Sequence, residues 1–268
     1  MTDFVATLGR VSRSIRNAFA GGSRASQNAL PALPDGMLVY AVGDIHGRND
    51  LLQALVAKIA HDSEARSAAG HKPTVVFLGD YVDRGPDSRG VIEFLLHGLP
   101  AGWDRRFLKG NHEEALLTFL ADPKFGAVWR DFGGLQALAS YGVTPQRKGA
   151  EIDWPATAAA FEAAFPPSHR DFLARLALRE VLGDYVFVHA GVRPRIPLEY
   201  QSEKDMLWIR EEFTAAGRAL PQTVVHGHSA SEKVVTGPGR ICVDTGAYVT
   251  GRLTAAGFQG TDVWYLST

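Results

Sequence analysis

Apolar residues follow two different periods in the N-terminal part of the chain. In 50–60 and in 88–98 they recur every three or four positions, which predicts two helices that each bury one face. Around these segments lie three short apolar runs, at 37–42, 74–78 and 105–108, which predict buried strands. Strands that alternate with helices are typical of an α/β layered fold with parallel connections.

The pattern changes over 113–180, where alanine-rich and aromatic helical segments are interrupted by glycines and prolines. We therefore expect a helical cap inserted into the domain. Strand-like runs return in "DYVFVHAG", "TVVHGH" and "RICVDTG", and "GRLTAAGF" and "DVWYLS" are expected to form a closing pair of strands. The predicted organisation is an N-terminal arm and linker over 1–36, followed by one catalytic domain over 37–268.

The bulk composition limits the class of protein. The 268 residues are 46% hydrophobic, which is enough to bury the core of one large domain. Cys242 is the single cysteine, so no disulfide forms within the chain and a reducing compartment is expected. No apolar run approaches the roughly 18 residues of a membrane span, and the N-terminus lacks the pattern of a secretory signal. These features predict a cytoplasmic protein.

The net charge of −1 is unevenly distributed. Residues 1–33 contain four arginines and one aspartate, a balance of +3, which leaves the rest of the chain at −4. The body thus lacks the basic excess of a nucleic-acid-binding protein, and we expect no nucleic-acid partner. In the arm, apolar residues recur every three or four positions from Phe4 to Phe19. A frayed or disordered tail is the favoured interpretation, and a basic amphipathic helix on a membrane surface is the weaker alternative.

Five polar motifs each follow an apolar run: "GDIHG", "GDYVDRG", "GNHE", "VHAGV" and "HGHS". Open α/β sheets place their ligand sites at the carboxyl ends of strands, so these motifs are expected to meet. The candidate metal ligands in them are Asp44, His46, Asp80, Asn111, His189 and His228. Oxygen and nitrogen ligands without a thiolate suit Mn, Fe or Zn in a catalytic site rather than a structural zinc site. Six ligands suit two ions that share a bridging carboxylate.

Two such ions hold a hydroxide between them at neutral pH and neutralise phosphate oxygens, which points to phosphoester hydrolysis. His112 stands beside a candidate ligand and is the candidate general acid, and Asp83 would keep its imidazole protonated. Arg84 and Arg210 are candidates to bind the phosphate through forked hydrogen bonds. The alternative for both arginines is a surface ion pair.

The ordered motifs closely resemble those of the metal-dependent phosphoprotein phosphatases, within the calcineurin-like metallophosphoesterases. The resemblance spans about 38–254, and "WRDFGG", "LWIR" and "VDTGAYVTGRLT" are similar to the bacterial and phage branch. It implies an α/β fold of two packed mixed β-sheets flanked by helices. It also implies a first metal held by Asp44, His46 and Asp80, and a second held by Asp80, Asn111, His189 and His228. In the same way it implies His112 as the acid paired with Asp83, with Arg84 and Arg210 on the phosphate.

Some positions depart from the family or leave a choice open. "HGH" offers two imidazoles, and the family pattern falls on His228, so His226 is expected to support or pack. Lys109 replaces the usual arginine of the "GNHE" motif without touching a proposed ligand. The loop that ends the eukaryotic enzymes is missing, so nothing is inferred about eukaryotic inhibitors. Asp244 and Tyr248 either line the site or have buried structural roles.

The expected activity is hydrolysis of phosphoserine or phosphothreonine in proteins, with phosphotyrosine as a further option, by direct attack of a metal-bridging hydroxide. The expected cofactors are two divalent ions, Mn first, with Fe or Zn as alternatives. The closest rival activity is hydrolysis of dinucleoside polyphosphates, which would use cap aromatics to stack bases: Phe125, Trp129, Phe132, Tyr141 and Trp154. A catalytically inactive phosphoprotein-binding module is the third alternative, disfavoured because every ligand and the acid are present. The scattered cations of the cap favour the protein substrate.

Overall fold

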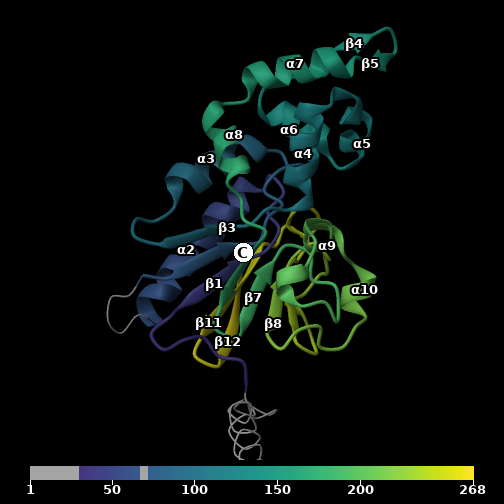
Figure 1. Cartoon of the computed structure of the whole chain (residues 1–268). Coiled ribbons are helices and arrows are strands. Elements are labelled where there is room, and N and C mark those ends of the chain that lie inside the picture. Colours follow the sequence, from purple (N-terminus) through teal and green to yellow (C-terminus); the bar gives the residue numbers. More distant parts are fainter. Residues whose placement is uncertain (1–29, 67–71) are drawn as a thin grey trace, which may run out of the picture. The chain divides into compact units, whose positions relative to one another are not determined.

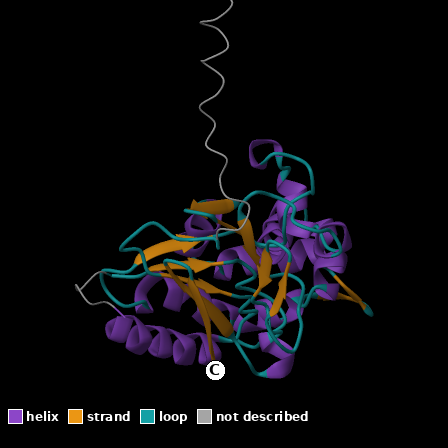
Figure 2. Cartoon of the chain, turned by 90° about the horizontal axis from the view of Figure 1, so that it is seen from below, coloured by secondary structure: helices purple, strands orange, loops and turns teal. Residues whose placement is uncertain are grey.

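Two five-stranded sheets form the centre of the fold in a computed structural model, which describes residues 30–66 and 72–268 (Figures 1 and 2). The first sheet has the strand order β12-β11-β1-β2-β3 and the second has the order β6-β7-β8-β10-β9. In the first sheet β1, β2 and β3 are parallel, and β11 and β12 are added antiparallel beside β1. In the second sheet β7, β8 and β10 are parallel, and β6 and β9 are antiparallel strands at the two edges. Both sheets are therefore mixed, which confirms the predicted fold class. The predictions for the arm before residue 30 lie outside the described residues.

The first sheet consists of β1 (Val39–Val42), β2 (Thr74–Phe77), β3 (Asp104–Phe107), β11 (Thr254–Gln259) and β12 (Asp262–Ser267). The second consists of β6 (Arg179–Leu182), β7 (Tyr185–Val188), β8 (Thr223–His226), β9 (Val235–Gly237) and β10 (Arg240–Cys242). The closing pair of strands predicted near the C-terminus is β11 and β12, which pair antiparallel. The short edge strands β6 and β9 were not among the predicted elements.

Alternating side chains of the buried strands face two different layers. Val39 and Ala41 of β1 pack with Phe187 of β7 in an apolar cluster between the two sheets. Tyr40 and Val42 point the other way and pack with the helices on the outer face of the first sheet. Every residue of β1 is buried, so the strand reads as a continuous apolar run rather than an alternating one.

Helices cover both outer faces. The outer face of the first sheet carries α2 (Asn49–Arg66) and α3 (Ser88–Glu93), and that of the second packs with α9 (Glu203–Trp208) and α10 (Glu211–Thr214). The segment predicted as one helix over 88–98 is α3 followed by a π-helical turn, Phe94–Gly98. None of the helices in the described ranges combines the length and the apolar character that crossing a bilayer requires.

The segment predicted as a cap contains five α-helices, a 3-10 turn over Pro123–Phe125 and one hairpin, in the upper part of Figure 1. They are α4 (Asn111–Ala121), α5 (Gly126–Asp131), α6 (Gly134–Ser140), α7 (Trp154–Ala164), α8 (Pro167–Ala174) and the strands β4 (Arg147–Lys148) and β5 (Glu151–Ile152). Phe119, Trp129 and Phe161 of these helices belong to the same apolar cluster as the helix-facing residues of the first sheet. The segment therefore shares the core of the domain.

Candidate metal centre

The six predicted ligands come from the ends of five strands. Asp44 and His46 follow β1, Asp80 follows β2, Asn111 follows β3 at the start of α4, and His189 and His228 follow β7 and β8. The strands within each sheet are parallel at these positions, so their carboxyl ends meet at one edge. All six residues are buried.

Asp80 lies at the middle of this cluster. Its Oδ2 is 3.5 Å from His46 Nε2, and its Oδ1 is 3.4 Å from His189 Nε2. Asn111 Oδ1 is 2.9 Å from the same His189 nitrogen. Within the described residues, two groups have potential ligand atoms that all lie within 4.8 Å of one another: His46, Asp80 and His112, and Asp80, His189 and His228. Asp80 is the member that they share, as a bridging carboxylate would be.

Asp44 belongs to neither group. Its Oδ2 accepts a hydrogen bond from the His228 backbone N–H at 2.9 Å, and its Oδ1 is buried without a partner among the described residues. His112, the predicted acid, takes part in the first group instead. The structure therefore brings Asp44 to the cluster, beside a predicted ligand of the second metal.

Backbone carbonyls set which imidazole nitrogen faces the cluster. His46 Nδ1 lies 3.0 Å from the Val82 carbonyl, and His189 Nδ1 lies 2.9 Å from the Leu78 carbonyl. Each Nδ1 must carry a proton to donate to a carbonyl, which leaves the lone pair of Nε2 toward Asp80. Burial lowers the pKa of His46 to about 3 and that of His228 to about 2, so both imidazoles are in the neutral form that binds metal.

The charges and the unpaired atoms of the site fit divalent cations. Burial, and then the neighbouring carboxylates of Asp244 and Asp80, raise the pKa of Asp44 well above its usual range. Burial also raises the pKa of Asp244 to about 6. Buried carboxylates this close repel one another unless a cation lies among them. His228 Nε2 is a further buried atom that has no partner in the described ranges. These donors are therefore suited to a pair of divalent ions.

Backbone strain is concentrated at the same place. Six non-glycine residues of the described ranges have positive φ, and five of them are predicted site residues: His46, Asp80, Asp83, Arg84 and His228. Such conformations cost about 1–3 kcal/mol each and persist where the surroundings hold them. Here the Asp80 carbonyl accepts from the backbone N–H of His46 at 2.8 Å, so two strained turns support each other.

Glu113 is a site residue that the motif analysis missed. Its buried carboxylate accepts backbone hydrogen bonds from Asp80 and Gly110 at 2.9 Å, from Tyr81 at 2.8 Å and from Val82 at 3.3 Å. Burial, and then the charge of Asp80, raise its pKa to about 7. Glu113 thus ties the loop that carries Asp80 to the start of α4. A glutamate in the first turn of a helix, as in a capping box, is the signal that was available in the sequence.

His112 and Asp83 form a buried pair. His112 Nδ1 lies 2.8 Å from Asp83 Oδ2, and neither side chain is exposed. Burial alone would lower the pKa of His112, but the charges of Asp80 and Asp83 outweigh it and raise that pKa. His112 Nε2 has no hydrogen-bond partner among the described residues and lies 3.9 Å from Asp80 Oδ2. This nitrogen therefore faces the cluster, and the raised pKa favours its protonated form.

The two predicted arginines reach the cluster from different sides. Arg84 Nη1 lies 3.2 Å from His46 Nε2, and its guanidinium carbon lies 4.7 Å from the ring centroid of Tyr248. Arg210 Nη1 donates to the His228 carbonyl at 2.9 Å. Neither arginine forms an ion pair with a carboxylate in the part of the chain that the structure describes. Both retain donors for an anion.

Three residues whose roles the sequence left undecided lie at different distances from the cluster. Tyr248 is 37% exposed and its ring centroid is 5.2 Å from that of His46, so it stands at the rim of the cluster. Asp244 is buried beside Asp44. His226 is buried against Phe213, with ring centroids 5.0 Å apart, and takes part in neither ligand group.

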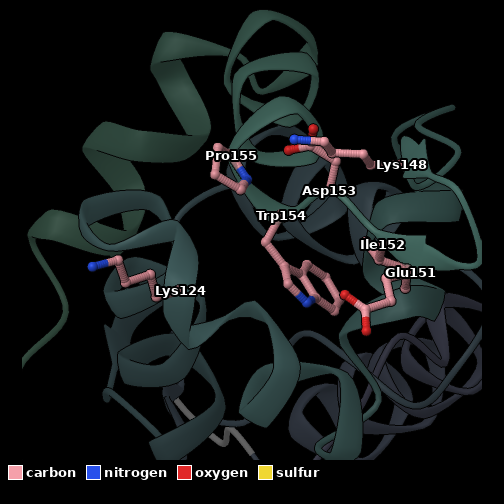
Figure 3. Close-up of a pocket in the computed structure, with 7 residues that line it drawn as sticks. All are labelled: Lys124, Lys148, Glu151, Ile152, Asp153, Trp154 and Pro155. Atoms are coloured by element: carbon pink, nitrogen blue, oxygen red, sulfur yellow. The ribbon is translucent and has the colours of Figure 1, made fainter.

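A separate hollow of about 620 Å³ lies on the cap (Figure 3). The indole of Trp154 lies at its centre in this view, and the other lining residues are Lys124, Lys148, Glu151, Ile152, Asp153 and Pro155. The lining comes from the β4–β5 hairpin and its surroundings and includes none of the predicted site residues. The hollow is therefore distinct from the metal cluster.

The model of the calcineurin-like phosphoesterase family matches residues 37–256, and the chain belongs to this family. Members of the family are metallophosphoesterases with a dinuclear metal site, and the His and Asp groups described above are candidates for it. This places the chain in a family of phosphoesterases.

Relatives of different activity are similar to this chain. A symmetrical bis(5'-nucleosyl)-tetraphosphatase of Hamiltonella defensa is 37% identical over 82 residues, which are 31% of this chain and 26% of that protein. The match thus spans about a quarter of that relative. Serine/threonine-protein phosphatase 1 of Salmonella typhimurium is 26% identical over 232 residues, 82% of this chain and 92% of that protein. A crystal structure assigned as a diadenosine tetraphosphatase has a TM-score of 0.57 at 23% identity and covers 89% of this chain and 98% of its own, which shows the fold alone.

Proposed function

We propose that this chain is a metal-dependent phosphoprotein phosphatase that hydrolyses phosphoserine and phosphothreonine in proteins. The observation that carries the proposal is the buried His112–Asp83 pair, whose free nitrogen lies 3.9 Å from the carboxylate shared by the two ligand groups. A general acid held this close to a candidate dinuclear site serves the cleavage of a phosphate ester with a poor leaving group. An inactive binding module has no need of this pair.

The proposed ligand assignments keep the sequence-based sets, which overlap with the two ligand groups at His46, Asp80, His189 and His228. Asp44, His46 and Asp80 would hold one ion, and Asp80, Asn111, His189 and His228 would hold the other. Divalent ions, when bound, would lower the pKa of water and neutralise phosphate charge. Mn is the proposed metal, with Fe and Zn as alternatives.

The other residues act on the phosphate and on the leaving group. Arg84 and Arg210 orient the phosphate through their free N–H donors. Hydroxide attacks the phosphorus on the side opposite the ester oxygen, so no further group has to accept a proton. As the ester P–O bond breaks, His112 transfers the proton on Nε2 to the leaving oxygen, and Asp83 stabilises the imidazolium before the transfer.

The cap favours a protein substrate over a dinucleotide. A dinucleotide site needs exposed aromatic rings that stack on bases and several cations for the phosphate chain. Trp129 and Tyr141 are buried in the core and cannot stack on a ligand. Trp154 lines the hollow on the cap, whose lining contains no predicted site residue. The two arginines at the cluster suffice for one phosphate.

Hydrolysis of dinucleoside polyphosphates is the second candidate function. It is favoured by the 37% identity to the Hamiltonella tetraphosphatase, a match that covers only 31% of this chain.

A comparison of substrates at one free Mn concentration tests the proposal. We expect a higher kcat/KM for phosphoserine and phosphothreonine peptides than for diadenosine tetraphosphate, with phosphotyrosine peptides measured beside them. His112→Asn is the control, because activity that does not fall by about 10²–10⁴ in this variant comes from a contaminant. A dinucleotide preference of tenfold or more, about 1.4 kcal/mol in the transition state, would overturn the proposal in favour of the second candidate. Peptide binding without turnover of any substrate would identify an inactive module.

A further inference from the structure

A side chain of the cap makes a hydrogen bond to the acid pair. Trp129 Nε1 donates to Asp83 Oδ2 at 3.0 Å, and this is the same oxygen that lies 2.8 Å from His112 Nδ1. All three side chains are fully buried. The other oxygen of Asp83, Oδ1, is buried without a partner among the described residues. The orientation of the Asp83 carboxylate is thus set by two donors on one oxygen.

Asp83 needs such support. Its backbone has a φ of 69°, a left-handed conformation that costs free energy for a residue other than glycine. Its backbone N–H donates to Ser88 Oγ at 3.0 Å, which holds the main chain but not the carboxylate. Without the indole N–H, the carboxylate has one remaining partner, His112, and can rotate about its own bond. The imidazole that it orients would then lose its fixed direction.

The indole itself is held rigidly. Its ring stacks on Phe119 with centroids 4.6 Å apart and an interplanar angle of 25°. A Cβ on Gly134 would lie 2.4 Å from the ring, so only glycine leaves room for it. The neighbouring Gly133 has a φ of 93°, and its carbonyl accepts from the Arg84 backbone N–H at 3.2 Å. The "WRDFGG" segment therefore contacts both the acid pair and the main chain of a predicted phosphate-binding arginine.

We propose that Trp129 is a positioning residue for the general acid, so that the cap completes the catalytic site as well as covering it. The inference rests on the proposed function, because it needs His112 to protonate the leaving oxygen. Trp129 does not touch the substrate. It holds Asp83, and through Asp83 it keeps His112 Nε2 directed at the oxygen that leaves. Its contribution is therefore largest where the leaving group most needs a proton.

The test is the dependence of kcat on the leaving group in Trp129→Phe. Phenylalanine keeps a ring against Phe119 and removes only the N–H donor. With the Mn-loaded full chain, we expect kcat for phenyl phosphate to fall roughly 10–100-fold and kcat for 2,4-dinitrophenyl phosphate to fall less than about threefold. KM should stay nearly constant, since both arginines remain.

Trp264→Phe is the matched control. Trp264 Nε1 donates to the Asp62 carboxylate at 2.9 Å, between α2 and β12, so this variant loses an equivalent bond outside the acid pair. We expect Trp264→Phe to change kcat for all the aryl phosphates by the same small factor. An unchanged dependence on the leaving group in a folded Trp129→Phe would overturn the inference. An equal loss for all substrates would also overturn it, because that result describes a purely structural role.

A spectroscopic measurement covers the case in which Trp129→Phe does not fold. In the metal-free protein, the indole N–H signal of Trp129 should shift in Asp83→Asn, whereas that of Trp264 should not. A Trp129 signal unaffected by Asp83→Asn would refute the hydrogen bond. Failure of the proposed function would give a different result, in which the Mn-loaded wild-type chain hydrolyses none of the aryl phosphates. The chain would then have no reaction for His112 to catalyse, and the inference would fail together with the proposed function.

Discussion

Gly227→Ala should displace Asp44, a predicted metal ligand, without unfolding the protein. A Cβ at position 227 would lie 1.9 Å from Asp44 Oδ1, whereas real Cβ contacts are essentially never shorter than 3.0 Å. The Asp44 carboxylate would have to move by roughly 1 Å, and its bond to the His228 N–H would break. Metal–ligand distances tolerate only about 0.2 Å. The φ of Gly227 is not in the left-handed region, so alanine introduces no backbone strain of that kind.

The expected magnitude follows from this displacement. Loss of one ligand or of its orientation lowers metal affinity by about 10–100-fold, which is about 1.4–2.7 kcal/mol of binding free energy. Gly227→Ala should therefore bind one ion clearly more weakly, whereas the other site should lose less. The metal-free protein should be destabilised by about 1–3 kcal/mol through the displaced carboxylate and the lost bond, and the restriction of the unfolded chain by alanine offsets about 0.4–1 kcal/mol of this.

Calorimetric titration of the metal-free protein with Mn measures both affinities directly. Gly217→Ala is the matched control: its Cβ would have no described atom within 4 Å, and its φ is also outside the left-handed region. We expect Gly217→Ala to bind both ions with wild-type affinity. The reasoning is refuted if Gly227→Ala does the same, since Asp44 would then not be a ligand or the site would tolerate its displacement.

Two further predictions concern the metals and the acid. Removal of metal by a chelator should abolish hydrolysis of an aryl phosphate, and added Mn should restore it; full activity after verified removal would contradict a metal-dependent mechanism. His112→Asn should retain both ions, and its kcat should fall by about 10²–10⁴-fold. The kcat and the metal content are measured on the same sample. Loss of an ion from this variant would show that His112 is a ligand, as its place in the first ligand group allows.

Most of the layered fold could be predicted from local patterns. Buried strands such as β1 are short apolar runs ended by a glycine, and α2 repeats its apolar residues with the helical period. The predictions failed where the local pattern is weak. The strands β6 and β9 are short, partly exposed edge strands, whose pairing depends on neighbours distant in the sequence. The segment 88–98 keeps the apolar spacing of an α-helix to its end. The spacing therefore does not distinguish the π-helical turn Phe94–Gly98 from a continued α-helix.

The kinds of side chain at the site were readable from the sequence, because each of the five motifs places its polar residues directly after a strand. The contacts among them were not. Asp83 and Trp129 are 46 residues apart, and no local pattern states that they share a hydrogen bond. The role of Glu113 likewise depends on the loop after β2 folding against the start of α4. Residue type and order thus determined the candidate chemistry, whereas distances, burial and orientation arose from the packing of two sheets and a helical segment whose partners are remote along the chain.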